Sequence, residues 1–286
     1  MPDTTLARTE TRDVRSRAGD AYRLFISRPD GPPGPGGFPV LYLLDGNATF
    51  PTAAVAVALQ SRRAQTTGVA PGLVVGVGYP IDDYLDSARR SYDYTPMVPA
   101  ADLAPRPDGM PWPKVGGAAR FLDFLEGELQ PMLAREFTID ARRQTIFGHS
   151  FGGLFVLNAL FTRPGVFRGY VAASPSIWFG NCAILRARDA FLAAPRLREP
   201  RDLLVTVGSL EQAAVDAEAA GGAEARKSDW VRRNRMVENA RELVRSLSRV
   251  AGLRVSFKEF DDENHSSVLP AAISRAVRFA LPAEPA

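Results

Sequence analysis

Short apolar segments alternate along the chain with longer segments of helical periodicity. Residues 22–27 alternate apolar and polar side chains, as a strand with one buried face does. Residues 40–44 (VLYLL) are apolar throughout, which is typical of a strand buried on both faces of a parallel sheet. Further segments of this strand-like character are residues 73–78, 145–148, 170–173, 203–208 and 255–260.

Segments with apolar side chains at helical spacing lie between these strands. They are residues 53–62, 118–135, 150–161, 230–250 and 267–280. This alternation predicts an α/β fold with a mostly parallel central sheet, right-handed crossovers and helices on both faces. In such a sheet the ligand site lies at the carboxyl ends of the strands.

Two segments fit neither pattern. Residues 96–117 are rich in proline and glycine and too long for a simple connection, so we expect a lid or a wall of the site. Residues 212–228 are rich in alanine, glutamate and glycine, and we expect a mobile surface insertion. Because no linker divides the chain, residues 1–286 are predicted to form a single domain.

Composition narrows the chemistry. The single cysteine, Cys182, excludes an intramolecular disulfide, and with two histidines, His149 and His265, a zinc site would have to be mostly carboxylate. We therefore expect no metal and no cofactor. The net charge of +3 is too small to indicate a nucleic-acid partner.

The chain also lacks membrane signals. No run reaches the roughly 20 apolar residues of a spanning helix, and the first twenty residues lack the apolar core of a secretory signal. We expect a cytoplasmic protein, or a periplasmic one if a signal has been removed.

The sequence Gly148-His149-Ser150-Phe151-Gly152 fits the pattern G-x-S-x-G between an apolar strand and an apolar helix. In this context the pattern predicts a nucleophilic serine, Ser150, on a tight strand-to-helix turn that exposes its hydroxyl. A glycine-rich turn that merely packs the helix on the sheet is the alternative.

Ser150 needs a base. His149 directly precedes the nucleophile and is expected to point away from it, which leaves His265, in the loop after the last strand. Glu211 follows the strand 203–208 and is predicted to orient the imidazole. Other carboxylates stay open as that acid, as does a serine–histidine dyad without one: Asp216, Glu218, Asp262 and Glu263.

An oxyanion hole should combine two backbone N–H groups. The N–H of Phe151, directly after the nucleophile, is one candidate. The other is the N–H of Asn47 where the strand 40–44 ends, with Gly46 allowing the backbone to turn inward. An ordinary Asp-Gly turn is the alternative interpretation of residues 45–47.

Four motifs of the chain resemble those of a known family. The motifs that carry the resemblance occur in the order LYLL-Asp45-Gly46-Asn47-A, Arg90-SY-Asp93-Y-Thr95-P, Gly148-H-Ser150-F-GG-LF and Glu263-Asn264-His265-SSVLPAA. They look like the α/β-hydrolases that include the bacterial trilactone siderophore esterases, which act on enterobactin and its glucosylated form salmochelin. S-formylglutathione hydrolases and mycolyltransferases are more distantly similar.

The resemblance implies an α/β-hydrolase fold, with Ser150 as nucleophile, His265 as base and residues 45–47 as the oxyanion loop. It settles neither the acid nor the substrate.

Basic and aromatic side chains are candidates for contact with the substrate. Residues 226–249 hold eight basic and three acidic side chains, a net charge of +5, which favours either a solvated helix face or an electropositive rim for an anionic substrate. We expect Arg90 to join that rim. We expect Tyr94 and Trp178, together with Tyr92 and Trp112, either to stack on aromatic substrate rings or to belong to the core.

These observations predict a serine esterase of a small-molecule ester. The preferred substrate is a trilactone catecholate siderophore of the enterobactin type, with ferric iron as part of an anionic substrate. The alternatives are a carboxylesterase or thioesterase of small acyl esters, an acyltransferase, and a binding protein that keeps the fold without catalysis.

Overall fold

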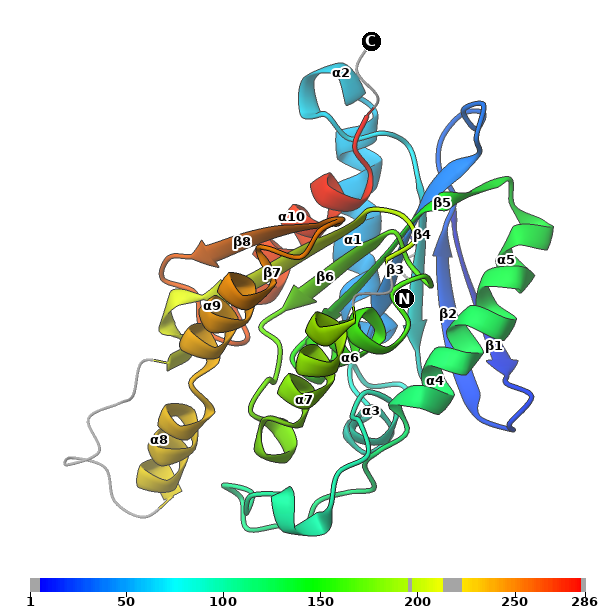
Figure 1. Cartoon of the computed structure of the whole chain (residues 1–286). Coiled ribbons are helices and arrows are strands. Elements are labelled where there is room, and N and C mark those ends of the chain that lie inside the picture. The colour runs from blue at the N-terminus through cyan, green and yellow to red at the C-terminus, as the bar shows by residue number, and fades with distance from the viewer. Residues whose placement is uncertain (1–5, 195–196, 213–222, 284–286) are drawn as a thin grey trace.

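The computed structural model describes residues 6–194, 197–212 and 223–283 (Figure 1). An eight-stranded sheet runs through the middle of the molecule in the order β1-β2-β4-β3-β5-β6-β7-β8. The strands are β1 (Thr9–Arg15), β2 (Ala21–Ser27), β3 (Phe38–Leu44), β4 (Leu73–Gly78), β5 (Ile139–His149), β6 (Gly169–Ala173), β7 (Arg201–Gly208) and β8 (Leu253–Phe260).

The sheet is antiparallel at one edge and parallel elsewhere. β1 pairs antiparallel with β2, and β2 with β4, whereas the pairs from β4 to β8 are all parallel. Side chains of β3, β4 and β6 are almost all buried, because helices cover both faces of these strands. The predicted α/β fold with a mostly parallel sheet is confirmed.

Helices form a layer on each face. Their bounds are α1 (Gly46–Ser61), α2 (Ala64–Thr67), α3 (Ser87–Asp93), α4 (Ala118–Phe124), α5 (Gln130–Glu136), α6 (Phe151–Thr162), α7 (Phe179–Ala193), α8 (Ala223–Asn234), α9 (Met236–Leu247) and α10 (Val268–Ala280). A π-helical turn, Leu125–Leu129, joins α4 to α5. Among the described residues, none of these helices combines the length and apolarity needed to cross a bilayer.

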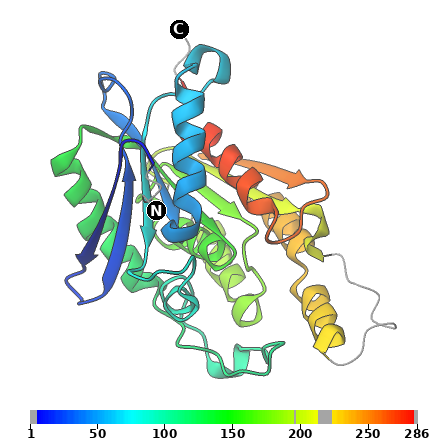
Figure 2. The same cartoon turned by 180° about the vertical axis from the view of Figure 1, so that it is seen from behind.

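Two apolar cores hold these layers to the sheet. α1 and α10 pack on one face around Phe50 and Ala276, as the view from behind shows (Figure 2). α4, α5, α6, α7 and α9 cover the other face around Phe121 and Leu154. Each large side chain buried here contributes about 1.5–3 kcal/mol relative to exposure.

Several elements differ from the expectation. The segment expected as one helix over 230–250 is two helices, α8 and α9, because Arg235 between them adopts a left-handed φ of 44°. α1 begins seven residues before the expected position 53. β1, α2, α3 and α7 had no counterpart in the sequence analysis.

The two expected insertions have different outcomes. Residues 96–117 are mostly irregular, with a single 3₁₀ turn at Ala100–Asp102. Residues 213–222, most of the second insertion, lie outside the described residues. Gln212 ends the 3₁₀ turn Ser209–Gln212, and residues 223–228 belong to α8.

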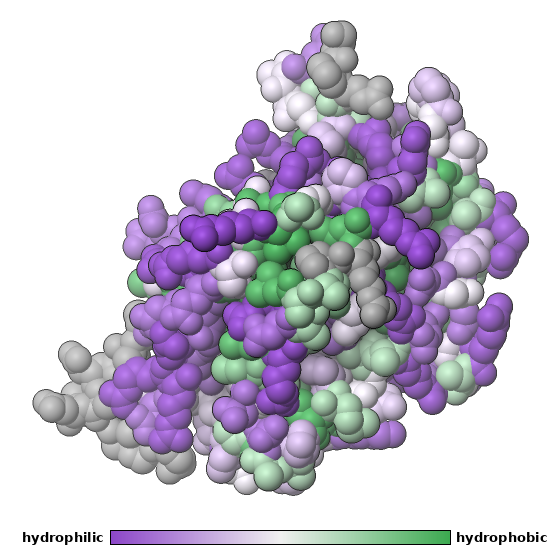
Figure 3. Space-filling model, viewed as in Figure 1, coloured by the Kyte–Doolittle hydropathy of each residue, from purple (hydrophilic) through white to green (hydrophobic). Residues whose placement is uncertain are grey.

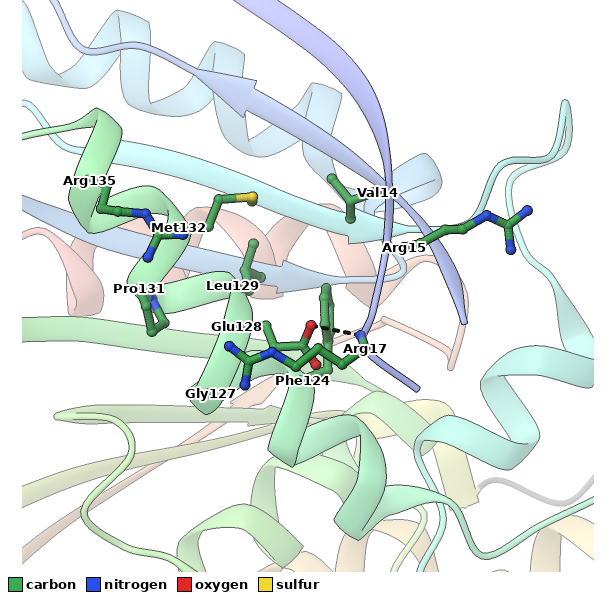
Figure 4. A pocket seen from close by; sticks show the side chains of 10 residues that line it. All are labelled: Val14, Arg15, Arg17, Phe124, Gly127, Glu128, Leu129, Pro131, Met132 and Arg135. Atoms are coloured by element: carbon green, nitrogen blue, oxygen red, sulfur yellow. Dashed lines mark hydrogen bonds between the residues drawn. The ribbon is translucent and has the colours of Figure 1, made fainter. Parts of the chain in front are cut away.

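A cavity of about 200 Å³ lies between β1 and the α4–α5 region, at the antiparallel edge of the sheet (Figure 4). Arg15, Arg17 and Arg135 line it together with Glu128, whose carboxylate accepts a hydrogen bond from the backbone N–H of Arg17 at 2.9 Å. None of the residues that line this cavity lies at the carboxyl ends of the parallel strands, where the predicted site residues follow β3, β5, β7 and β8.

Candidate active site

Ser150 occupies a strained turn between β5 and α6. Its φ of 60° and ψ of −117° are unusual for a residue with a side chain, and such strain of about 1–3 kcal/mol persists only where the surroundings enforce it. A Cβ on Gly148 would lie 2.2 Å from the carbonyl oxygen of Gly152, so only glycine lets the helix approach the strand this closely. The Ser150 N–H donates to the carbonyl of Ala173 on β6 at 3.0 Å, which ties the turn to the neighbouring strand.

The structure brings His265 and Glu211 together. His265 Nδ1 lies 2.6 Å from Glu211 Oε2, although the residues are 54 positions apart. The Glu211 side chain is fully buried, whereas 43% of the His265 side chain is exposed. The other carboxylate oxygen accepts hydrogen bonds from Ser174 Oγ at 2.5 Å and from the Gly208 N–H at 2.6 Å. A carboxylate fixed in this way can hold an imidazole in one orientation, with Nε2 on the opposite side of the ring.

Hydrogen bonds donated by backbone N–H groups join the two loops that carry this pair. The Leu210 N–H donates to the carbonyl of Glu263 at 3.0 Å, and the Asp262 N–H donates to Ser209 Oγ at 3.0 Å. The position of His265 relative to Glu211 is therefore set by more than the contact between their side chains.

The rival carboxylates are placed differently. Asp262 and Glu263 make no ion pair with His265 within the described parts of the chain, although they lie next to it in sequence. Asp216 and Glu218 lie outside the described residues. Of the carboxylates weighed from the sequence, Glu211 is thus the one whose contact with His265 is seen.

Residues 45–47 form the junction between β3 and α1. Asp45 adopts a left-handed conformation, φ 53° and ψ 48°, directly before the first residue of α1, Gly46. A Cβ on Gly46 would lie 2.7 Å from the backbone of Gly76 on β4, so this position requires glycine. The Asn47 side chain accepts a hydrogen bond from the Tyr79 N–H at 2.9 Å and donates to the Tyr79 carbonyl at 3.0 Å, which fixes the first turn of α1 to the end of β4.

The N–H groups of Asn47 and Phe151 both lie in the first turn of a helix, where backbone donors have no partner within the helix. Neither has a hydrogen-bond acceptor among the described residues. Both are therefore available as donors to an oxyanion, and the assignment of that role to them stays a prediction.

Arg90 lies in a different environment from the one expected. Its guanidinium makes a two-pronged contact with Asp45, at 3.0 and 2.9 Å, and also approaches the carbonyl oxygen of His149 at 3.5 Å. Only 13% of the Arg90 side chain and 5% of the Asp45 side chain are exposed. Burial alone would lower the pKa of Arg90, but the charge of Asp45 and its hydrogen bonds raise it above its ordinary value. Arg90 thus bridges the junction at residue 45 to the residue before Ser150, and its charge is already paired.

Tyr94 also differs from the expectation of a substrate contact. The side chain is fully buried, and its hydroxyl accepts the Asp45 N–H at 3.0 Å. A ring without exposed surface cannot stack on a substrate, so Tyr94 instead supports the left-handed turn at Asp45. Close by, Asp93 accepts a hydrogen bond from the Tyr79 hydroxyl at 3.2 Å, and burial raises the pKa of Asp93 to about 6.

His149 contacts the predicted base. The ring centroids of His149 and His265 are 4.6 Å apart, and the buried Nε2 of His149 has no hydrogen-bond partner among the described residues. Burial, then the nearby His265 and Arg90, lower the pKa of His149 well below its ordinary value. His149 is therefore neutral at physiological pH.

The sequence analysis missed two serines at this site. Ser174 donates to Glu211, and Ser176 Oγ lies 3.4 Å from Ser150 Oγ. Both follow β6 directly, in the sequence Ser174-Pro175-Ser176. Polar residues directly after a buried parallel strand were the signal that could have identified them.

Four of the eight basic side chains in residues 226–249 form ion pairs within the described part of the chain, Arg241 with Glu259 among them. Arg232 and Arg233 contact Asp229, and Arg235 contacts Glu238 and Glu242. The surface over α8 and α9 is mainly hydrophilic in the space-filling view (Figure 3). Local ion pairs of this kind favour the solvated helix face over a rim dedicated to an anionic substrate.

Trp178, the third predicted substrate contact, is partly exposed, and its ring centroid lies 6.0 Å from that of Phe151, directly after Ser150. Of the three, it is the one whose surroundings suit contact with a ligand.

Comparison with known proteins decides the family. The model of the Esterase family matches residues 16–242. The chain belongs to this esterase family. The relatives and the solved structures that resemble this chain confirm both the motif-based resemblance and the α/β-hydrolase fold.

Three similar proteins illustrate this. The ferri-bacillibactin esterase BesA of Bacillus subtilis is 43% identical over 97% of this chain and 91% of its own. The siderophore enterobactin esterase of Emericella nidulans is 37% identical over 84% of this chain and 80% of its own. The crystal structure of the BES protein from Bacillus cereus superposes with a TM-score of 0.85 at 38% identity and covers 99% of both chains.

Proposed function

We propose that this esterase hydrolyses the ester bonds of a trilactone siderophore, with Ser150 as nucleophile, His265 as base and Glu211 as the residue that orients the base. The observation that carries the proposal is the 2.6 Å contact between His265 and the buried Glu211, on the loops that follow neighbouring strands at the same edge of the sheet as the strained turn of Ser150. This combination of a strained serine, a histidine and a buried carboxylate matches the chemistry of acyl transfer.

In the proposed reaction Ser150 Oγ attacks the ester carbonyl carbon while Nε2 of His265 takes the hydroxyl proton. The N–H groups of Phe151 and Asn47 stabilise the negative oxygen of the tetrahedral intermediate, and Gly46 gives the backbone the turn that this needs. The intermediate collapses when the carbon–oxygen bond to the leaving alcohol breaks, and His265 returns the proton to that oxygen. Water, deprotonated by His265, then attacks the acyl-enzyme and releases the acid.

The choice of substrate rests on two kinds of support. The names of the relatives given above contain bacillibactin and enterobactin, and both are esterases. The motifs of the sequence analysis point to the same class of trilactone. In this proposal ferric iron, when present, belongs to the substrate and takes no part in the chemistry of the protein. The predicted cytoplasmic location stays a prediction.

The test is mass spectrometry of the products formed from iron-free and ferric enterobactin, with the Ser150→Ala variant as the control. We expect linear trimer, dimer and monomer that appear in that order with wild-type enzyme and are absent with the variant. A panel of p-nitrophenyl esters is assayed in parallel, because a general esterase of small esters would hydrolyse these rapidly. Rapid hydrolysis of p-nitrophenyl acetate by an enzyme that leaves enterobactin intact would contradict the proposed substrate.

A further inference from the structure

The three tryptophans of the chain meet at one place. Trp112 comes from the irregular segment 96–117, Trp178 from the turn before α7, and Trp230 from α8. The ring centroids are 4.8 Å apart for Trp178 and Trp230, 6.4 Å for Trp112 and Trp178, and 6.5 Å for Trp112 and Trp230. All three are partly exposed, so the cluster borders the surface and is not simply part of the buried core.

The cluster adjoins the nucleophile. The ring of Phe151, directly after Ser150, has its centroid 6.0 Å from Trp178 and 6.3 Å from Trp112. Ser176, whose hydroxyl lies 3.4 Å from that of Ser150, is two residues before Trp178. An aromatic wall therefore continues from the catalytic turn.

A cavity of about 340 Å³ opens beside this wall, a size within the range of small-molecule sites. Its lining combines the two indoles with polar side chains: Trp112, Trp178, Asp102, Asn181, Arg233 and Asn234. Because the tryptophan rings already contact one another, no further ring fits between them. A ligand ring would lie in the cavity, against the exposed surfaces of Trp112 and Trp178.

Two features indicate that the backbone and the indole beside this cavity are held in fixed positions. Trp112 Nε1 donates to the carbonyl of Ala104 at 2.8 Å, which holds the indole in place within an otherwise irregular segment. Gly180, Asn181 and Cys182, which also line the cavity, all have left-handed φ values of 60°, 51° and 57°. Left-handed backbone is unfavourable for residues with a side chain, and such strain concentrates at functional sites.

We propose that this cavity is a subsite for an aromatic ring carried by the acyl part of the substrate, held against Trp112 and Trp178. The proposal rests on the proposed ester hydrolysis at Ser150 and adds where the substrate is recognised and by which chemistry. Aromatic rings attract one another beyond the burial of apolar area, whereas a saturated ring of similar size gains only the burial. The polar side chains of the lining suit ring hydroxyl groups.

The test compares two synthetic esters that differ in one ring, the methyl esters of N-benzoylserine and N-cyclohexanecarbonylserine. We expect wild-type kcat/KM to favour the benzoyl ester about twofold to tenfold, since a tenfold ratio corresponds to about 1.4 kcal/mol. The ratio should fall toward one in Trp178→Leu and Trp112→Leu. Trp178→Phe, which keeps an aromatic face, should retain most of it.

A matched control separates recognition from general damage. Phe279 is a partly exposed ring that lines a different cavity, beside α10 on the other face of the sheet. Phe279→Leu should leave the benzoyl-to-cyclohexyl ratio at its wild-type value. A ratio of one in the wild type, or an unchanged ratio in both tryptophan-to-leucine variants, would overturn the subsite.

Fluorescence gives a second readout that does not depend on turnover. Because all three tryptophans lie in the cluster, the tryptophan emission of the Ser150→Ala variant, excited at a wavelength that tyrosine does not absorb, reports on this place alone. Titration with the benzoyl ester should change the emission at lower concentration than the cyclohexyl ester does. Emission that responds equally to both esters would argue against the subsite.

The two proposals fail separately. If enterobactin stays intact while the enzyme prefers the benzoyl ester, the proposed siderophore substrate is wrong and the aromatic subsite stands. If enterobactin is cleaved while the benzoyl-to-cyclohexyl ratio is one, the siderophore substrate stands and the aromatic subsite is wrong.

Discussion

The buried pair of Arg90 and Asp45 makes a sharp prediction about both stability and catalysis. The two side chains are 13% and 5% exposed and share two hydrogen bonds of 3.0 and 2.9 Å. Arg90→Met removes the charge and keeps an unbranched apolar side chain. Asp45 is then a buried carboxylate without its partner, and breaking a buried pair in this way costs about 3–5 kcal/mol.

The double variant checks the physical reason. Asp45→Asn combined with Arg90→Met leaves no buried charge at this place, so it should be more stable than Arg90→Met alone. Urea unfolding of the wild type, both single variants and the double variant gives the four free energies of unfolding. A loss below about 1 kcal/mol in Arg90→Met, or a double variant less stable than that single variant, would refute the pairing argument.

The same variants decide what Arg90 does in catalysis. Arg90 joins the turn at Asp45 to the carbonyl of His149, so its loss should shift the predicted oxyanion donors relative to Ser150. A shift near 1 Å costs about 10²-fold in rate, and we expect kcat to fall with little change in KM for p-nitrophenyl acetate. An Arg90 that contacted the substrate would give the opposite result. KM would then rise for an anionic ester, and the neutral ester would be unaffected.

Three further predictions concern titrating groups. Glu211→Gln should lower kcat by about 10²-fold or more, whereas Asp262→Asn should stay near the wild type in steady-state assays; equal losses would count against Glu211 as the acid. The pKa of Asp93 is raised to about 6, so folding favours its protonated form, and the stabilisation present below pH 4 is lost as pH rises through 6. Urea unfolding should therefore show Asp93→Asn gaining up to about 3 kcal/mol on the wild type between pH 4 and pH 7, and a pH-independent difference would contradict this. The pKa of His149 is lowered, so the neutral form stabilises the fold above about pH 6.5 and that stabilisation is lost on acidification. His149→Gln should flatten the decline in stability between pH 6.5 and pH 5, and an unchanged decline would show that another group causes it.

Much of the parallel sheet could be predicted because its strands are apolar on both faces. The apolar runs in β3, β4 and β7 have the length of strands and are too short to span a bilayer, so they have few other interpretations. The contact of His265 with Glu211 agrees with an inference from strand order alone, because the carboxyl ends of parallel strands meet at one edge.

β1 was missed for the opposite reason. The strand Thr9–Arg15 lies at the edge of the sheet and is polar at nearly every position, so hydrophobic periodicity could not reveal it. The break at Arg235 was missed because an arginine in left-handed backbone leaves no mark on the apolar spacing, which continues through it.

The role of Arg90 shows most clearly what the sequence alone does not reveal. A charged residue in a polar segment is expected to be exposed, and no local pattern in the sequence indicates that Arg90 forms a buried ion pair with Asp45, 45 positions away. The convergence of Trp112, Trp178 and Trp230 is long-range in the same sense. Each looks like an isolated aromatic residue until the fold brings them together.

The central claim is that Ser150 forms a covalent acyl-enzyme, and labelling with a fluorophosphonate tests it most directly. Peptide mapping by mass spectrometry should find one modified residue, Ser150, in the wild type, with loss of esterase activity in proportion to labelling. Ser150→Ala should stay unlabelled and lose at least about 10³-fold in kcat while it keeps its fold. Labelling at another serine, or an active Ser150→Ala variant, would contradict the account.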